Sequence, residues 1–270
     1  MAATTFEFDG RELQPTGSGG SLQGASQALP NGAYSTLRTY GRDKVLRLGQ
    51  HVARLNESAA LQGSSGSLDE RWVRNAIARA LAATGHPESR LRLTFAPPRF
   101  FVAIEPFAPP AESLYHDGVA CLTVPVRRPN PRAKDTRFAA EAARTYAALP
   151  AGIHEGLMVA EDGAILEGLS SNFFALASGV LRTEEARVLL GVTRSLALEV
   201  AEGLLPVVRE AVRIGVPGLT EAFITSASRG ILPVVRIDGT PLGDGRPGAV
   251  TRSLMERFQA LVDREAARIT

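Results

Sequence analysis

Apolar and polar residues alternate in short runs along most of the chain, and Gly, Asp, Ser and Pro separate these runs. Alternation with a period of two residues is typical of strands, whereas apolar residues three and four positions apart are typical of helices. The helical spacing predicts helices over 49–59 and 67–83, after 134, from 191 onward and over 249–267. The alternating runs predict strands over 33–40, 44–48, 90–95, 100–106, 120–126, 156–160, 164–167, 173–177 and 180–182. This mixture indicates an α/β (α+β) protein.

Asp-Gly pairs mark the predicted hairpins, because Gly takes the positive φ that a tight turn requires. The pair Asp162-Gly163 joins the strands 156–160 and 164–167, and Asp9-Gly10 turns the segment Phe6–Leu13 back on itself. The turn Ser178-Gly179 predicts a second pair of strands, 173–177 and 180–182.

A polar stretch follows the strand 164–167 and reads Glu167-Gly-Leu-Ser-Ser-Asn172. A carboxylate at the end of a strand, next to a Gly and a polar loop, is placed to face a pocket rather than to fill a core. A solvated loop with one exposed Glu is the alternative, and the spacing alone leaves both readings open.

Two predicted helices begin with groups that suit an anion. His51 and Arg54 lie three positions apart and share one face of the helix 49–59. Thr193 can cap the helix that starts at Gly191, and the free N–H groups of a helix N-terminus bind anions. Since every helix has an N-terminus and surface His-Arg pairs are common, neither feature identifies a site by itself.

A Pro-rich, charged segment, Arg127-Arg-Pro-Asn-Pro-Arg132, is the predicted boundary between two domains. The expected organisation is an N-terminal α/β domain over 1–126, an interdomain linker over 127–133 and a C-terminal domain over 134–270. The Gly- and Ser-rich stretch 15–30 is predicted to be a loop.

The composition is that of a soluble globular protein, with 44% hydrophobic and 21% charged residues among 270. The net charge of +2 is scattered, which does not indicate nucleic-acid binding. No apolar run approaches the roughly 18 residues of a membrane span. The first residues lack the features of a secretory signal, so a cytoplasmic location is expected. The single cysteine, Cys121, excludes an internal disulfide and a thiolate metal cluster, and no metal site is predicted.

The pattern Glu-Gly-x-x-Ser-Asn-x-Phe at residues 167–174 resembles the central motif of the class IV aminotransferases. These are fold-type IV enzymes that use pyridoxal 5'-phosphate (PLP), and they include branched-chain and D-amino-acid aminotransferases and aminodeoxychorismate lyase. The resemblance implies a two-domain subunit with PLP in the interdomain cleft. It assigns Glu167 to the protonated pyridine nitrogen of PLP, where a carboxylate keeps the ring cationic, and Asn172 to the same cofactor site.

The chain has only two lysines, Lys44 and Lys134. Lys134 follows the linker at the head of a predicted helix, and in this family the PLP lysine has the same position before the Glu. The resemblance therefore assigns Lys134 as the lysine that forms the Schiff base and moves the proton between substrate Cα and cofactor, with Lys44 as the alternative. The segment Leu48-Gly-Gln-His-x-x-Arg-Leu is similar to the element whose Arg binds the PLP phosphate, which assigns that role to Arg54.

Two further segments match elements of the family in the expected order. Gly191-Val-Thr-Arg is similar to the helix start whose amides hold the PLP phosphate, and Glu221–Val234 is similar to the strand and loop with the last phosphate and substrate contacts. These matches assign Val192, Thr193, Ser226 and Ala227 to the cofactor and Ser228 to the substrate. Tyr34, which is more like the D-amino-acid members, and Arg99, from its place on a loop between two strands, are the other predicted substrate contacts.

Three readings of the function follow. The first is a PLP-dependent aminotransferase that moves an amino group between an amino acid and a 2-oxo acid through a Lys134 Schiff base. The second is aminodeoxychorismate lyase, a PLP-dependent β-elimination that gives 4-aminobenzoate and pyruvate. The third is a PLP- or anion-binding protein without turnover, which needs neither Lys134 nor Glu167. The resemblance favours the aminotransferase and implies a homodimer, while the identity and chirality of the amino donor stay open.

Overall fold

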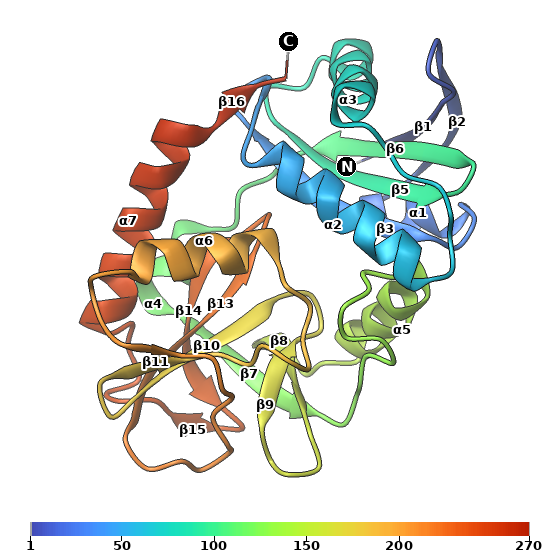
Figure 1. Cartoon of the computed structure of the whole chain (residues 1–270). Coiled ribbons are helices and arrows are strands. Elements are labelled where there is room, and N and C mark those ends of the chain that lie inside the picture. Colours follow the sequence, from blue (N-terminus) through green and yellow to red (C-terminus); the bar gives the residue numbers. More distant parts are fainter. Residues whose placement is uncertain (1, 270) are drawn as a thin grey trace. The chain divides into compact units, whose positions relative to one another are not determined.

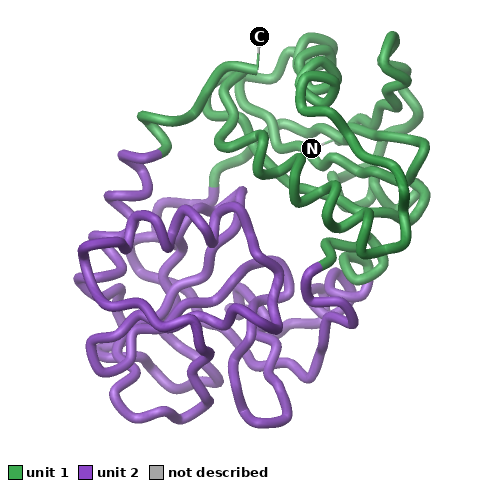
Figure 2. Tube along the Cα trace, viewed as in Figure 1, with its two compact units in different colours: residues 1–109, 133–140, 262–270 green, residues 110–132, 141–261 purple. Residues whose placement is uncertain are grey.

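The computed structural model describes residues 2–269 and confirms the mixed α/β character of the chain (Figure 1). The backbone forms two compact units, which Figure 2 distinguishes by colour. The second unit consists of Pro110–Arg132 and Glu141–Leu261. The first unit consists of the described residues before Pro110, Ala133–Ala140, and the described residues from Val262 onward. Lys134 thus belongs to the first unit, and the predicted domain bounds remain a prediction.

The first unit contains a seven-stranded sheet in the order β16-β4-β3-β5-β6-β1-β2. Its neighbouring strands all pair antiparallel. The strands are β1 (Ala3–Phe8), β2 (Leu13–Gly19), β3 (Ala33–Tyr40), β4 (Lys44–Val45), β5 (Ser89–Ala96), β6 (Arg99–Pro106) and β16 (Ala267–Arg268), and the helices are α1 (Leu22–Gln27), α2 (Leu48–Leu61) and α3 (Glu70–Thr84).

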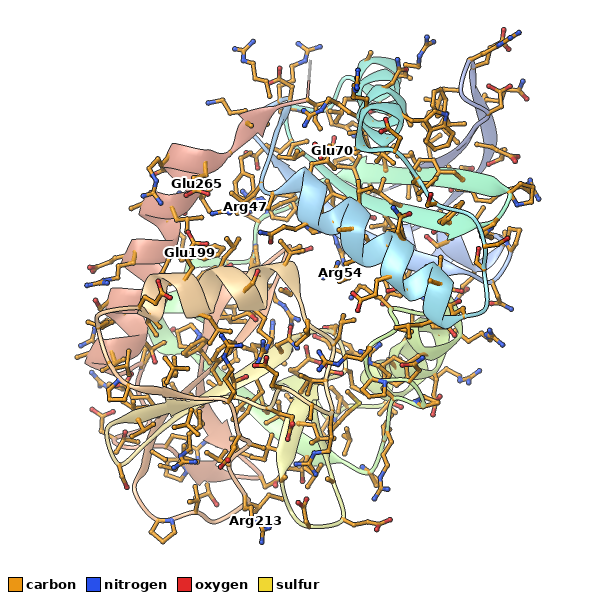
Figure 3. The ribbon with its side chains drawn as sticks, in the orientation of Figure 1. Arg47, Arg54, Glu70, Glu199, Arg213 and Glu265 are labelled. Atoms are coloured by element: carbon orange, nitrogen blue, oxygen red, sulfur yellow. The ribbon has the colours of Figure 1, made fainter. Side chains whose placement is uncertain are left out.

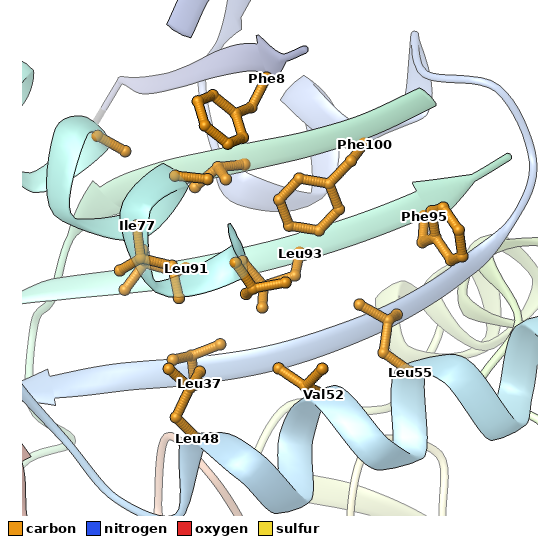
Figure 4. Close-up of a cluster of buried hydrophobic side chains, with 14 of the residues drawn as sticks. Phe8, Leu37, Leu48, Val52, Leu55, Ile77, Leu91, Leu93, Phe95 and Phe100 are labelled. Carbon is orange, nitrogen blue, oxygen red and sulfur yellow. The ribbon is translucent and has the colours of Figure 1, made fainter. Parts of the chain in front are cut away.

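The central strand β5 shows why this sheet has two different faces. Leu91, Leu93 and Phe95 are buried in an apolar cluster with residues of α2 and α3 (Figure 4). Because successive side chains of a strand point to opposite faces, Arg92 and Thr94 lie on the other face. The apolar face packs into the core of the unit. The opposite face carries polar side chains that are not part of this core.

The segment 15–30 is not a loop, and this prediction was wrong. It forms the end of β2 and the short helix α1. The hydroxyl oxygen of Ser21 accepts a hydrogen bond from the Gly24 amide and caps α1, and Leu22 is buried. The predicted strand 44–48 is also shorter than expected, because α2 already begins at Leu48.

The second unit contains a nine-stranded sheet, which follows the order β12-β11-β10-β13-β14-β7-β8-β9, with β15 beside β14. An additional pairing joins β9 to β10, with Glu167 opposite Asn172. The strands β10, β13, β14, β7, β8 and β9 therefore form a closed series. The strands are β7 (Val119–Val124), β8 (Ile153–Val159), β9 (Ile165–Gly168), β10 (Asn172–Ala177), β11 (Val180–Arg182), β12 (Val207–Val208), β13 (Leu219–Ser226), β14 (Gly230–Ile237) and β15 (Thr240–Pro241).

The predicted hairpin at Asp162-Gly163 is present as the β8–β9 pair. A further hairpin, β14–β15, turns at Asp238-Gly239, and both glycines have positive φ. The helices are α4 (Glu112–Asp117), α6 (Val192–Ala201), and the greater part of α5 (Thr136–Ala147) and α7 (Ala249–Glu265). Across residues 2–269, none of the helices has the length and apolar character to cross a membrane.

Candidate active site

The backbone of Lys134 is fixed between β3 and α2 within the first unit. The Tyr34 amide donates to the Lys134 carbonyl at 2.9 Å, and the Lys134 amide donates to the Ser58 hydroxyl oxygen at 3.0 Å. An isolated bridge between Ala33 and Asp135 extends this attachment. The Lys134 Nζ atom lies 4.8 Å from the centroid of the Tyr34 ring. The structure therefore brings together the predicted catalytic lysine and one of the predicted substrate contacts.

Arg54 projects from α2 (Figure 3) and is linked to a buried pair of side chains. Its Nη2 donates to the Ser35 Oγ at 2.8 Å, and that Oγ lies 2.9 Å from His51 Nδ1. Since a guanidinium only donates, the Ser35 hydroxyl can donate its own proton to a neutral His51. Burial, with smaller effects of Arg54 and Lys134, lowers the pKa of His51 well below its usual value. The positive charges of Arg54 and Lys134 thus both disfavour protonation of His51.

The Glu167 side chain is buried in the second unit, with 2% of its surface exposed, and both of its oxygens accept hydrogen bonds. Arg128 Nε donates to Oε1 at 3.0 Å. Asn172 Nδ2 and the Leu189 amide donate to Oε2 at 3.1 and 3.3 Å. Three donors, one of them cationic, favour an ionised carboxylate and fix its orientation. The reading of Glu167 as an exposed residue of a solvated loop does not describe this side chain.

Asn172 connects Glu167 to the start of α6. Besides Glu167, its Nδ2 also donates to the Leu189 carbonyl at 2.7 Å. A Cβ atom on Gly191 would lie only 2.2 Å from Asn172 Oδ1, so this close approach requires a glycine. Asn172, predicted as a cofactor contact, is therefore placed to hold the Glu167 carboxylate against the loop that precedes α6.

Val192 and Thr193 form the first turn of α6, and both are buried. Gly191 is the N-cap residue, and no side chain caps the helix, so the expectation that Thr193 caps it was wrong. The first N–H groups of a helix have no partner within it. The amides at this N-terminus, together with the Thr193 hydroxyl, suit an anion such as a phosphate.

Ser226 ends β13, and Ala227 and Ser228 follow it in the turn before β14. The register of β13 against β10 places Thr225, which precedes this turn, opposite Asn172. The second unit thus brings the Glu167 segment and the predicted phosphate-binding turn to neighbouring strand ends.

A buried ion pair joins this turn to the loop between β9 and β10. Arg229 Nε donates to Ser226 Oγ at 3.0 Å, and Arg229 Nη2 lies 2.9 Å from Glu155 Oε2. The same Glu155 oxygen accepts from the hydroxyls of Ser170 and Ser171, at 2.7 and 3.0 Å. Glu155 is completely buried, so these contacts fix the turn and the loop to one another.

Two of the predicted residues are placed differently from the rest. Arg99 forms two hydrogen bonds of 2.7 Å with Glu7, so its guanidinium already has a carboxylate partner. Lys44, the alternative Schiff-base lysine, is an exposed residue of β4 that pairs with Tyr40 and Arg268 along the sheet. These positions give no support to a substrate contact by Arg99 or to a cofactor bond by Lys44.

The sequence did not identify three charged residues of this region. Arg128 lies in the segment predicted as a linker, yet its side chain is only 6% exposed and pairs with Glu167. Glu155 lies within β8, and Arg229 directly precedes β14. A carboxylate in the middle of an apolar strand, as at Glu155, was the one available indication, because a buried charge requires a partner.

The groups that each unit holds fit the chemistry of PLP. In the first unit, Lys134 offers an amine for an aldehyde and Arg54 a guanidinium for a phosphate. In the second unit, Glu167 offers a fixed carboxylate for a pyridinium nitrogen, and the start of α6 offers amides for the phosphate. The predicted roles are therefore divided between the two units.

Comparison with known proteins identifies a family and a fold. The model of the family described as Amino-transferase class IV matches residues 32–237. D-alanine aminotransferase of Bacillus licheniformis is 25% identical over 288 residues, covering 97% of this chain and 98% of that protein. The branched-chain-amino-acid aminotransferase of Pseudomonas aeruginosa is 33% identical over 118 residues, covering 43% of this chain and 38% of that protein.

The fold is also that of a solved aminotransferase structure. The branched-chain aminotransferase of the thermophilic archaeon Thermoproteus uzoniensis, solved with norvaline, superposes with a TM-score of 0.81 at 22% identity, covering 100% of both chains. This likeness confirms the predicted fold type IV, and the family match confirms the resemblance seen in the sequence. Because the match spans well over half of its length, the chain belongs to the class IV aminotransferase family.

Proposed function

We propose that this PLP-dependent aminotransferase moves an amino group between an amino acid and a 2-oxo acid, with Lys134 as its catalytic residue. When bound, PLP supplies an aldehyde that receives the amino group and a ring that withdraws electrons from the substrate Cα. The observation that carries the proposal is the fixed backbone of Lys134, whose amide and carbonyl are both hydrogen-bonded, beside the Tyr34 ring.

Lys134 holds the cofactor and then moves the proton. With its backbone fixed to Tyr34 and Ser58, only the side chain needs to move, which keeps the amine within reach of a substrate Cα. With PLP bound, the Lys134 amine would act as the general base that takes the substrate Cα proton and as the general acid that gives it back. Loss of the amine therefore removes both the cofactor attachment and the proton transfer.

Glu167 would keep the pyridine nitrogen of bound PLP protonated. Its carboxylate is held by Arg128 and by Asn172, so it would meet the ring nitrogen of bound PLP in a fixed orientation without reorganising. A neutral side chain at this position would no longer stabilise a cationic ring nitrogen. The same fixed orientation excludes a role for Glu167 as a mobile proton carrier.

Residues of several elements would hold the phosphate of PLP. Arg54 supplies a guanidinium, and Val192 and Thr193 supply helix N-terminal amides with one hydroxyl. Ser226 at the end of β13 and Ala227 in the turn after it would supply further contacts. Ala227 has no hydroxyl, so its contribution is limited to its backbone N–H.

The decisive experiment uses the two lysines as a matched pair. The purified protein with PLP is mixed with single amino acids of each hand, and the visible absorbance band of the bound cofactor is followed. We expect one group of amino acids to bleach the band and a 2-oxo acid to restore it. Lys134→Ala should lose the band and the turnover, whereas Lys44→Ala should keep both.

Other outcomes would redirect the assignment. A band that no amino acid changes, with pyruvate released from aminodeoxychorismate, would establish the lyase instead. A Lys134→Ala protein that still transaminates would contradict the role of this lysine. A protein that never binds PLP would favour the reading without turnover.

The proposal also covers the oligomeric state, the cellular location and the domain bounds. We infer a homodimer in the cytoplasm, with domain bounds at 1–126 and 134–270 and a linker at 127–133, because the resemblance to the family implies the dimer and the domain layout. Light scattering of the purified protein tests the dimer, and limited proteolysis at the linker tests the bounds. A monomer at micromolar concentration would contradict this part without affecting the chemistry.

A further inference from the structure

A cavity of about 390 Å³ lies in the first unit, at the edge of the sheet where β4 pairs with β16. Its volume is at the lower end of the range of small-molecule sites. The residues that line it come from β4, the start of α2, α3, the end of α7 and β16, and they are Val45, Arg47, Leu48, Arg74, Glu265 and Ala267. None of these six is a predicted cofactor or substrate residue, so the cavity is a candidate site of its own.

One part of the lining is aliphatic. Val45 and Leu48 are buried members of the apolar core of the first unit. Ala267 is the partner of Val45 in the pairing of β4 with β16. An aliphatic group placed against these side chains would be removed from water, which favours its binding.

The other part of the lining is charged. Arg47 and Glu265 form an ion pair, and Figure 3 labels both residues. Arg74 Nη2 lies 2.9 Å from Glu70 Oε1, and Arg74 Nη1 donates to the Arg268 carbonyl at 2.9 Å. The lining itself thus carries two guanidinium groups and one carboxylate, which gives it an excess of positive charge.

Arg74 retains hydrogen-bond donors for a ligand. A guanidinium has five donors, and the two contacts with Glu70 and Arg268 use only part of them. The Arg74–Glu70 pair joins two partly exposed side chains one helical turn apart, and such pairs contribute little to stability. A carboxylate in the cavity would offer Arg74 a bidentate partner beside an apolar wall, where the interaction is less screened by water.

Arg47 holds its place at the cavity in an uncommon backbone conformation. It is the N-cap residue of α2, with φ 51° and ψ 47°, in the left-handed region that long side chains rarely adopt. Strained residues of this kind are concentrated at binding sites and switch regions. No side chain caps α2, so the partial positive charge of the helix start adds to that of the arginines.

We propose that this cavity binds a small carboxylic acid with an apolar chain, with its carboxylate on Arg74 and Arg47 and its chain against Val45 and Leu48. Apolar amino acids, their 2-oxo acids and simple fatty acids share this chemistry. The cavity would then be a second small-molecule site on the chain. This inference goes beyond the proposed transamination and does not depend on Lys134.

A purely structural role of the same charges makes a different prediction. If Arg47 and Arg74 served only to hold the end of α7 and β16 to the two helices, no carboxylate would bind in the cavity. Substitution of Arg74 would then leave ligand binding unchanged. The two accounts are therefore distinguished by a binding measurement rather than by activity.

Equilibrium dialysis of the PLP-loaded protein against hexanoate measures the amount bound per chain and the affinity. Arg74→Met should weaken binding at one site by about tenfold or more. Ala267→Leu should have a similar effect, because the larger side chain would occupy part of the cavity. Arg71→Met removes an exposed arginine of the same helix that does not line the cavity, and it should bind hexanoate as the wild-type protein does. Any binding at the active site is common to all four proteins, so the difference between them reports on the cavity.

Competition identifies the ligand chemistry. Hexanamide has the shape of hexanoate without its charge, and inorganic phosphate has charge without an apolar chain. Both should displace hexanoate from the cavity much more weakly than unlabelled hexanoate does. Leucine and 4-methyl-2-oxopentanoate distinguish the sources, because stronger displacement by one of them shows whether the site takes an amino acid or a 2-oxo acid.

Each result bears on the proposal. Equal hexanoate binding by the wild-type protein and Arg74→Met, or equal displacement by hexanamide and hexanoate, would overturn it. If Arg74→Met does not fold, Ala267→Leu still decides the question. A protein that binds hexanoate in the cavity but transaminates no amino acid would contradict the proposed function and leave this inference standing.

Discussion

Substitutions of Glu155 and Arg229, which form a buried ion pair, should have strongly non-additive effects on the free energy of unfolding. Glu155 is completely buried, and the Arg229 side chain is 12% exposed. Removal of one partner leaves the other charge without its counter-charge in a largely dry environment. We therefore consider the substitutions Glu155→Leu and Arg229→Met, singly and together.

The contacts set the expected magnitude. Breaking a buried pair from one side costs about 3–5 kcal/mol, whereas replacing both partners with apolar groups of similar size is often close to neutral. Glu155→Leu additionally leaves the hydroxyls of Ser170 and Ser171 without their acceptor, at about 1 kcal/mol each. Arg229→Met should lose about 3–5 kcal/mol and Glu155→Leu about 5–7 kcal/mol, and the double variant should lose clearly less than their sum.

Urea unfolding followed by circular dichroism measures these free energies for all four proteins. PLP titration of the same proteins should show weaker binding in both single variants, because the pair fixes Ser226 and the loop after Glu167. Additive losses in the double variant, or a loss below about 1 kcal/mol for Glu155→Leu, would refute the reasoning.

Two further predictions concern the groups around the cofactor. Gly191→Ala should weaken PLP binding about tenfold in a PLP titration, because the added Cβ would displace Asn172 and with it the Glu167 carboxylate. Gly17→Ala is the control, because a Cβ at that position would meet no other atom within 4 Å. His51 is held neutral in the folded protein, so below pH 6.5 the unfolded state binds the extra proton and stability falls by up to about 1.4 kcal/mol per pH unit. In urea unfolding at a series of pH values, His51→Asn should reduce the pH dependence of the unfolding free energy below pH 6.5, and His116→Asn should not. An unchanged pH dependence in His51→Asn would contradict a neutral buried His51.

The short motifs could be read from the sequence because their chemistry is local. Glu167 and Asn172 lie on one strand-loop-strand segment, so their proximity follows from the pairing of β9 with β10. Lys134 was singled out because the chain has only one other lysine and because the family has its PLP lysine at this position, and its role stays a prediction. The pattern of alternating residues also placed β3, β5 and β6 within a residue or two of their observed ends.

Partners that are distant in the sequence could not be predicted in this way. Arg128 lies among prolines and charges typical of an exposed linker, and only the fold shows that Glu167 buries and pairs it. Arg47 lies in the predicted strand 44–48, and nothing local shows that it pairs with Glu265. The composition of 15–30 conceals a helix whose stability comes from the burial of Leu22 rather than from propensity.

The measurement that tests the central claim most directly is the identification of the lysine that carries the cofactor. Borohydride reduction of the PLP-loaded protein fixes the cofactor to its lysine, and peptide mass spectrometry then locates the added mass. The two lysines, Lys44 and Lys134, make the outcome unambiguous. We predict stoichiometric label on Lys134 and none on Lys44. Label on Lys44, or none on either lysine, would contradict the account.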